Sequence, residues 1–210
     1  MTKRVLLLLA DGFEPMEASG FTDVLGWANI DGDEPIELVS AGLRSPLKAT
    51  FGFSVIPDAL VADLDLGSFD ALAVPGGFGS AGFYKDAMSE PFLAVIRHFA
   101  GRQQAVASVC VAALALGAAG VLEGRVATTY HQAGGKRRAQ LESYGAHFID
   151  EAVVVDGHLI SSTGPDTAVE VAFALLADLT SERNSARIRD LMRVPWPAPS
   201  WWTSPQVPPA

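Results

Sequence analysis

Residues 105–120 read AVASVCVAALALGAAG, and this stretch decides the fold. Its first five residues, 105–109, have the length and the β-branched content of a buried strand. Cys110, the only cysteine in the chain, follows directly. Residues 111–119 then read as an apolar, alanine-rich helix, which Gly120 closes as a C-terminal cap. The stretch predicts a strand, a sharp turn at Cys110 and a helix.

A side chain at such a junction points into the crevice beyond the sheet, next to free N–H groups at the helix N-terminus. The pattern is that of a nucleophile elbow built on sulfur, so Cys110 is a candidate nucleophile. A free cysteine also packs commonly as a small buried hydrophobe. The local pattern leaves both interpretations of Cys110 open.

Buried strands and amphipathic helices alternate on both sides of this unit. This alternation predicts an α/β fold with a doubly wound parallel sheet, sandwiched by helices. Two short hairpins are also expected, the second around Asp156-Gly157, a pair that favours tight turns. The expected strands are 5–10, 36–39, 71–74 and 126–129, the helices are 14–28, 91–100, 136–144, 168–179 and 181–192, and the hairpins are 47–56 and 153–160.

The chain divides into an α/β domain over residues 1–180 and a C-terminal part, residues 181–210. That part consists of a charged helix and a tail rich in proline and tryptophan, with Trp196, Trp201 and Trp202. Exposed aromatic clusters mark interaction surfaces, so we expect the tail to be an arm packed on the body or on a partner. A disordered end is the alternative.

Composition limits the classes of function. The 210-residue chain carries a net charge of −9, which argues against nucleic-acid and acidic-membrane partners. The apolar run 5–10 is too short for a signal peptide, and no run approaches the ~20 residues of a membrane span. One cysteine forms no internal disulfide, which fits a reducing compartment. We therefore expect a cytoplasmic protein, and because no His, Cys and Asp residues show metal-ligand spacing, no metal.

Three loops are expected to meet at one edge of the sheet. They are 11–17, 75–79 and the turn at Cys110, and each follows a strand whose carboxyl end faces the same crevice. In doubly wound folds this crevice is where ligands bind. Gly76 and Gly77 allow close backbone approach there, although a tight turn alone also explains them.

Four motifs in series resemble the ThiJ/PfpI family of the class I glutamine-amidotransferase-like superfamily. They are GFEPME (12–17), PGG (75–77), SVC (108–110) and STGP (162–165), and the resemblance covers about residues 3–180. It implies a flavodoxin-like sandwich that usually forms a homodimer and acts on a small-molecule substrate without a cofactor. Relatives include the Parkinson-associated deglycase and isonitrile hydratases.

The resemblance also implies the site residues. Cys110 is the nucleophile and Glu17 its acid/base partner, although Glu17 could merely cap its helix. Backbone N–H groups of Gly77 and Val111, with Gly76 beside them, form an oxyanion hole. Helix N–H groups should lower the pKa of the thiol, and a thiolate should push Glu17 towards its protonated form.

His131 is the candidate for a third catalytic residue, as a proton carrier. Some relatives carry histidine directly after a Thr-Thr pair, where this chain has Tyr130 and then His131. An equally good interpretation is that His131 has no catalytic role and is either exposed or has its hydrogen bonds satisfied within the fold.

The resemblance implies two classes of function. One is an enzyme of the glyoxalase or deglycase type that attacks small electrophiles, with an isonitrile-hydratase-like lyase as runner-up. Isonitrile hydratases carry aspartate and threonine where this chain has Glu17 and Val111. The other class is a redox-sensing or chaperone-like stress protein whose Cys110 is oxidised.

Overall fold

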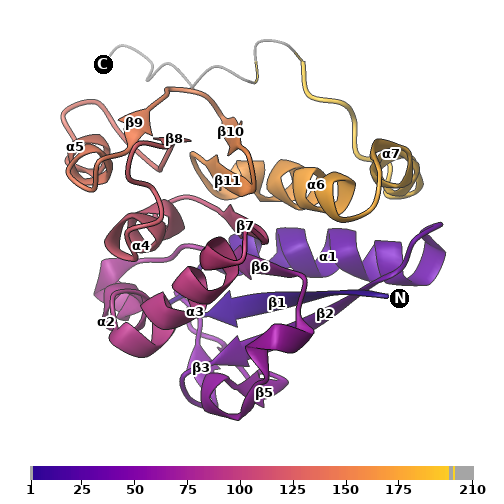
Figure 1. The fold of residues 1–210 in the computed structure, drawn as a ribbon, viewed down its shortest axis with the longest axis horizontal. Helices are drawn as coiled ribbons and strands as arrows, with labels where there is room; N and C mark the ends of the chain where they lie inside the picture. The colour runs from indigo at the N-terminus through magenta and orange to yellow at the C-terminus, as the bar shows by residue number, and fades with distance from the viewer. Residues whose placement is uncertain (1, 199–200, 202–210) are drawn as a thin grey trace.

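A computed structural model describes residues 2–198 and 201 of the chain. Its centre is a seven-stranded sheet in the order β10-β11-β7-β6-β1-β2-β5 (Figure 1). All neighbouring strands are parallel except the hairpin β10–β11 at one edge. The strands are β1 (Lys3–Leu9), β2 (Ile36–Gly42), β5 (Ala59–Leu60), β6 (Ala71–Val74), β7 (Ala105–Ser108), β10 (Val153–Asp156) and β11 (Leu159–Ser162).

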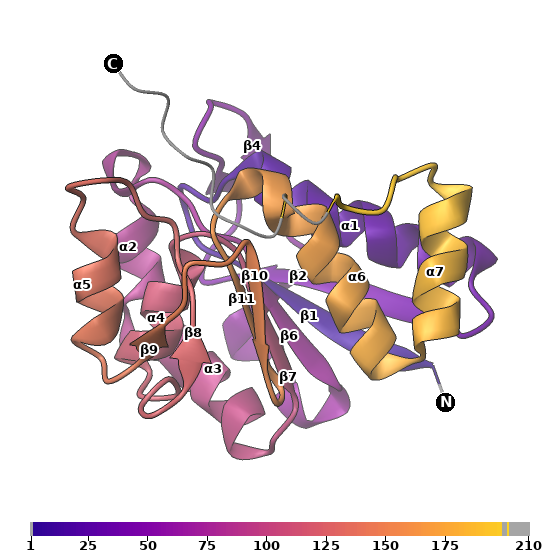
Figure 2. The ribbon, with the colours of Figure 1, turned by 90° about the horizontal axis from the view of Figure 1, so that it is seen from above.

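Helices cover both faces of this sheet, as the fold prediction requires (Figures 1 and 2). One layer holds α1 (Pro15–Asp31), α6 (Ala168–Leu179) and α7 (Glu182–Leu191). The other holds α2 (Phe83–Ala87), α3 (Glu90–Gly101), α4 (Ala112–Ala118) and α5 (Arg137–Glu142). Two small two-stranded sheets lie outside the main sheet. One pairs β3 (Leu47–Lys48) with β4 (Ser54–Val55), and the other pairs β8 (Val126–Ala127) with β9 (His147–Phe148). The described residues also form four short 3₁₀ helices, Val61–Asp63, Leu66–Ser68, Gly79–Ala81 and Pro165–Thr167.

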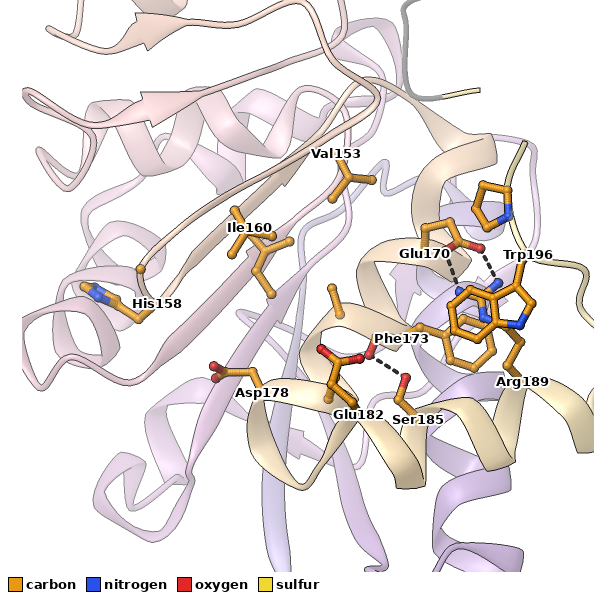
Figure 3. Close-up of a pocket in the computed structure, with 15 residues that line it drawn as sticks. Val153, His158, Ile160, Glu170, Phe173, Asp178, Glu182, Ser185, Arg189 and Trp196 are labelled. Carbon is orange, nitrogen blue, oxygen red and sulfur yellow. Dashed lines mark hydrogen bonds and ion pairs between the residues drawn. The ribbon is translucent and has the colours of Figure 1, made fainter. Parts of the chain in front are cut away.

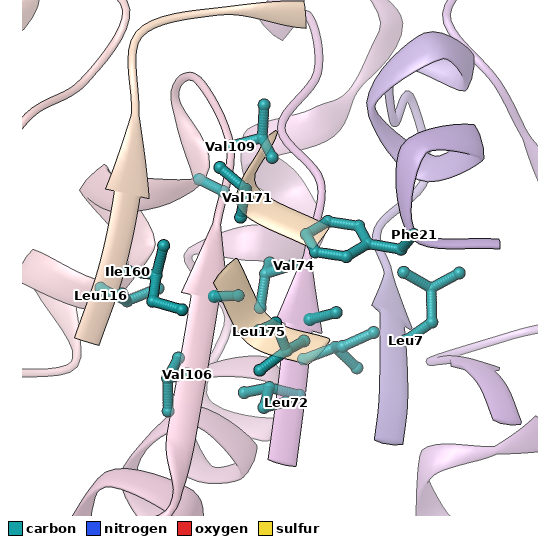
Figure 4. Close-up of a cluster of buried hydrophobic side chains, with 14 of the residues drawn as sticks. Leu7, Phe21, Leu72, Val74, Val106, Val109, Leu116, Ile160, Val171 and Leu175 are labelled. Atoms are coloured by element: carbon teal, nitrogen blue, oxygen red, sulfur yellow. The ribbon is translucent and has the colours of Figure 1, made fainter. Parts of the chain in front are cut away.

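The core lies between the sheet and the helices. Strand β1 is apolar throughout its buried part because both of its faces are covered, which is typical of a parallel sheet. Phe21 of α1 and Val171 and Leu175 of α6 pack against Leu7 and Leu72 (Figure 4). Each such side chain contributes about 1.5–3 kcal/mol by leaving water. This packing holds the strand ends, and therefore the loops after them, in fixed positions.

Several details differ from the sequence-based expectations, and three of them concern the helices, the sheet and the second hairpin. Helix α2 was not predicted, because it has five residues and follows a glycine-rich loop that masks it. Strand β8 pairs only with β9 and stays outside the main sheet. In the second hairpin Asp156 pairs with Leu159, so the turn consists of Gly157 and His158, one residue later than expected.

Helix α7 and the described part of the tail pack on the α/β body. Both guanidinium nitrogens of Arg189 donate to the Glu170 carboxylate, at 2.7 and 2.5 Å, and the Ser185 hydroxyl donates to the Phe173 carbonyl. The Trp196 ring lies 4.4 Å from the Arg189 guanidinium carbon. Trp201 packs against the core as well, whereas Trp202 lies outside the described residues. A role of the tail as an arm stays a prediction. None of the helices in the described part is long and apolar enough to cross a bilayer.

Candidate functional site

Cys110 occupies a strained turn between β7 and α4. Its φ of 59° is in the left-handed region, which non-glycine residues adopt mainly where surrounding structure enforces it. Three hydrogen bonds enforce it here: the Cys110 N–H donates to Ser162 O at 3.0 Å, Thr129 Oγ1 donates to Cys110 O at 3.0 Å, and Val109 N–H donates to Val74 O at 3.1 Å. The expected elbow at Cys110 is present.

Glu17 faces this thiol from the first turn of α1. Its side chain is buried, Gly76 N–H donates to its Oε2 at 2.6 Å, and a hydrogen bond links its carboxyl group to the Cys110 thiol. The neighbouring Glu14 N–H donates to Gly76 O at 2.8 Å. The loops after β1, β6 and β7 therefore meet, as their places in the sequence predict.

Burial controls the ionisation of this pair. Loss of hydration raises the pKa of Glu17 from 4.5 to about 8, against the opposing effect of the Gly76 hydrogen bond. Burial also raises the pKa of the Cys110 thiol, and the Glu17 charge and its hydrogen bond raise it further. The neutral carboxyl and the neutral thiol are consequently the favoured forms near pH 7.

The expectation of a lowered thiol pKa does not hold in this geometry. Val111 N–H does favour the thiolate, but its effect is smaller than that of burial. The next helix amide, Ala112 N–H, donates to Val109 O at 3.0 Å and is therefore not available to the sulfur.

The two glycines of the second loop have different surroundings. A Cβ on Gly76 would lie 2.9 Å from Glu17 Oε2 and 3.1 Å from Val111 N, so glycine lets the carboxyl approach the elbow. A Cβ on Gly77 would lie 2.2 Å from Gly12 O. Since Gly76 N–H serves Glu17, it is a positioning group, and Gly77 and Val111 remain the candidates for an oxyanion hole.

His131 is engaged elsewhere. Its Nδ1 lies 3.0 Å from Thr129 O, its Nε2 lies 2.9 Å from an Asp150 carboxylate oxygen, and its ring packs edge-on against Phe148. These contacts secure the loop after β8, and both ring nitrogens have partners. A role for His131 as proton carrier stays a prediction.

Glu14 is a site residue that the sequence reasoning missed. It is buried, its Oε2 has no hydrogen-bond partner among the described residues, and its charge raises the pKa of both Glu17 and Cys110. Burial raises the pKa of Glu14 as well. Its position three residues before Glu17, on the same face of the helix start, was the available signal.

A cavity of about 380 Å³ lies away from this site, between the β10–β11 hairpin, α6 and α7 (Figure 3). Apolar side chains, including Val153, Ile160 and Phe173, form much of its wall, and the Glu170–Arg189 pair and Trp196 lie at one end. None of its lining residues belongs to the three loops around Cys110. Within the described residues no group of three or more His, Cys, Asp or Glu side chains could hold a metal ion.

An open α/β sheet with a cysteine at a strand-to-helix elbow, facing a buried carboxyl from the first loop, defines a protein of the cysteine nucleophile-elbow class. The chain belongs to the DJ-1/PfpI family, whose model matches residues 3–178.

Known relatives agree with this assignment. The chain is 31% identical over 186 residues to the protein dj-1beta of Drosophila melanogaster, covering 87% of this chain and 92% of that protein. It is 31% identical over 202 residues to isonitrile hydratase of Pseudomonas putida, covering 95% and 81%. The crystal structure of Drosophila melanogaster DJ-1beta matches with a TM-score of 0.81 at 29% identity, over 93% of this chain and 100% of that one.

Another relative is about twice as long as the part that this chain matches. Protein DJ-1 homolog A of Arabidopsis thaliana is 29% identical over 191 residues, or 91% of this chain, and the chain spans only 46% of that protein.

Proposed function

We propose that the protein is a cofactor-free enzyme that adds the Cys110 thiol to small electrophilic carbonyl compounds, 2-oxoaldehydes in particular. The observation that carries this proposal is the pairing of a thiol at a strained elbow with a buried carboxyl that stays protonated to about pH 8. A neutral carboxyl both donates and accepts a proton, which is what addition of a thiol to a carbonyl requires.

In the addition step the sulfur of Cys110 forms a bond to the aldehyde carbon. The C=O π pair moves to the aldehyde oxygen, which takes the Glu17 proton, while the thiol proton passes to the other oxygen of Glu17. The product is a hemithioacetal and Glu17 is again neutral. In this proposal the backbone N–H groups of Gly77 and Val111 stabilise the developing charge on the oxygen.

Completion of the reaction needs only water. A proton moves from the former aldehyde carbon to the neighbouring carbonyl carbon, and the hydroxyl proton on the former aldehyde oxygen passes to the former keto oxygen. This gives the thioester of a 2-hydroxy acid, and water then releases the 2-hydroxy acid and the thiol. The net change is a 2-oxoaldehyde plus water to a 2-hydroxy acid, so no external oxidant or reductant is consumed. In this proposal Glu17 carries these protons, which its raised pKa of about 8 supports.

A second candidate activity, hydration of isonitriles, has the similarity to isonitrile hydratase in its favour. The site differs from that expected for such an enzyme by carrying Glu17 and Val111. Oxidation sensing is less favoured, because a buried thiol with a raised pKa has little of the thiolate on which oxidation depends.

The test is a turnover screen of wild type, Cys110→Ala and Glu17→Gln against 2-oxoaldehydes, isonitriles and acyl esters. The proposal expects 2-hydroxy acid from wild type, none above background from Cys110→Ala, and a loss of about 10²–10⁴-fold in Glu17→Gln. Turnover of isonitriles alone would establish the second candidate instead. Turnover that survives in Cys110→Ala would refute both.

A further inference from the structure

The cavity beside the β10–β11 hairpin exists because one face of α6 carries small side chains. Four residues at helical spacing share the face that borders the cavity: Glu170, Ala174, Ala177 and Asp178. The two alanines leave a hollow that larger side chains would fill. A volume of about 380 Å³ and a largely apolar wall are typical of a site for a small molecule.

Apolar surface stays open to solvent around this cavity. Trp196 is 65% exposed and Val155 is 59% exposed, although both line the cavity. Ile160 and Phe173, which line it as well, are buried. Exposed apolar side chains that adjoin an apolar hollow mark a place where a ligand can exclude water. The wall therefore fits the apolar part of a ligand, and Trp196 and Phe173 fit an aromatic ring in particular.

Negative charge is in excess along the cavity wall. Three carboxyl groups line it, those of Glu170, Asp178 and Glu182. Arg189 supplies a positive charge, but both of its terminal nitrogens already bind Glu170. Asp178 and Glu182 are exposed, and their side chains make no hydrogen bond or ion pair within the part of the chain that the structure describes.

His158 at the other side of the cavity does not supply the missing positive charge. Burial lowers the pKa of its imidazole and Arg125 lowers it further, against the opposing effect of Asp178. The ring is consequently neutral near pH 7. Arg125 is paired with Asp156, at 3.1 Å. Uncompensated carboxylates beside an apolar wall, in a chain of net charge −9, favour a cation and disfavour an anion.

We propose that this cavity binds a small organic amine with an aromatic body. Figure 3 shows Asp178 and Glu182 on the side of α6 and α7 and Ile160 on the side of the hairpin, so a ligand between them meets both kinds of surface. The body packs on Ile160 and Phe173, and the ammonium group lies at Asp178 and Glu182. The cavity is separate from the crevice at Cys110, so the inference does not depend on the proposed function.

The experiment is an NMR titration of the isotope-labelled full chain with three probes that differ at one end. The probes are 3-phenylpropylamine, 3-phenylpropan-1-ol and 3-phenylpropanoate, and shifts of the backbone amides report both the place and the dissociation constant of each. Asp178→Asn and Glu182→Gln each remove one carboxylate from the wall. Asp63→Asn is the matched control, because Asp63 is an exposed aspartate that follows β5, at the opposite edge of the sheet. Ala174→Leu fills the hollow, and thermal melts show whether each variant is folded.

Shifts caused by the amine should concentrate in β10, β11, α6 and α7, and the amine should bind more tightly than the alcohol and the propanoate. Asp178→Asn and Glu182→Gln should each weaken the amine roughly two- to fivefold, the effect of one exposed ion pair, and leave the alcohol unchanged. Asp63→Asn should behave as wild type, and Ala174→Leu should weaken amine and alcohol alike.

Four results would overturn the inference. They are no binding of the amine, shifts confined to the loops around Cys110, equal binding of amine and propanoate, and equal effects of Asp178→Asn and Asp63→Asn on the amine.

Discussion

Replacing Glu17 by glutamine should stabilise the protein in a way that grows with pH. The folded protein holds the Glu17 proton up to about pH 8, whereas the ordinary value of 4.5 applies once the chain unfolds. Between these two values the unfolded chain releases a proton that the folded chain keeps. The unfolding free energy of wild type therefore falls as pH rises through this window, by about 1.4 kcal/mol per pH unit.

Glutamine is neutral in the folded and in the unfolded chain, so the stability of Glu17→Gln does not fall with pH for this reason. At pH 7 the gain from Glu17→Gln is about 3 kcal/mol relative to acid pH, which corresponds to roughly 6–12 °C in melting temperature for a chain of this size. At pH 5 most of the difference should vanish. The glutamine oxygen still accepts from Gly76 N–H, so the site keeps its shape.

The assay is urea unfolding of wild type and Glu17→Gln at half-unit steps from pH 5 to pH 8. Glu123→Gln removes an exposed carboxylate and measures the general effect of one lost charge. A stability difference for Glu17→Gln that is the same at every pH, or one that shrinks as pH rises, would refute the reasoning about burial.

Further predictions concern the loop glycine, the C-terminal helix and the assembly. Gly77→Ala should lower stability by about 1–3 kcal/mol or more and abolish turnover, because its Cβ meets Gly12 O at 2.2 Å; urea unfolding and the turnover assay measure both. Glu170→Gln leaves the buried Arg189 charge uncompensated and should cost about 3–5 kcal/mol in urea unfolding, whereas a loss below 1 kcal/mol would argue against the pair as an anchor. Light scattering at micromolar concentration should give twice the chain mass of 22.1 kDa, as the proposed homodimer requires, and deletion of residues 194–210 should lower thermal stability or change this mass.

The parallel α/β sheet and the meeting of the three loops could be predicted because they depend on local patterns. Continuous apolar runs such as 71–74 identify buried parallel strands, and the carboxyl ends of parallel strands share one edge. Both ends of the helix 168–179 were predicted correctly, because the sequence shows its apolar residues and the Pro165 and Thr180 that flank it.

The state of the thiol could not be predicted in this way. The sequence places Cys110 at a helix start, where N–H groups lower a pKa, but it does not report how completely packing removes water from Cys110 and Glu17. In the folded protein burial is the larger effect on both. Glu14 was missed for a similar reason, since only tertiary packing buries its carboxyl group beside Glu17 and Cys110 and leaves its Oε2 without a partner among the described residues.

The rate of Cys110 alkylation by iodoacetamide as a function of pH tests the central claim most directly. The account predicts a wild-type midpoint above the ordinary thiol value of about 8.5, and a lower midpoint in Glu17→Gln, since that change removes the carboxylate whose charge and hydrogen bond raise the pKa of Cys110. A midpoint at or below about 8.5 that is the same in both proteins would contradict it, because Cys110 and Glu17 would then not act as a coupled pair.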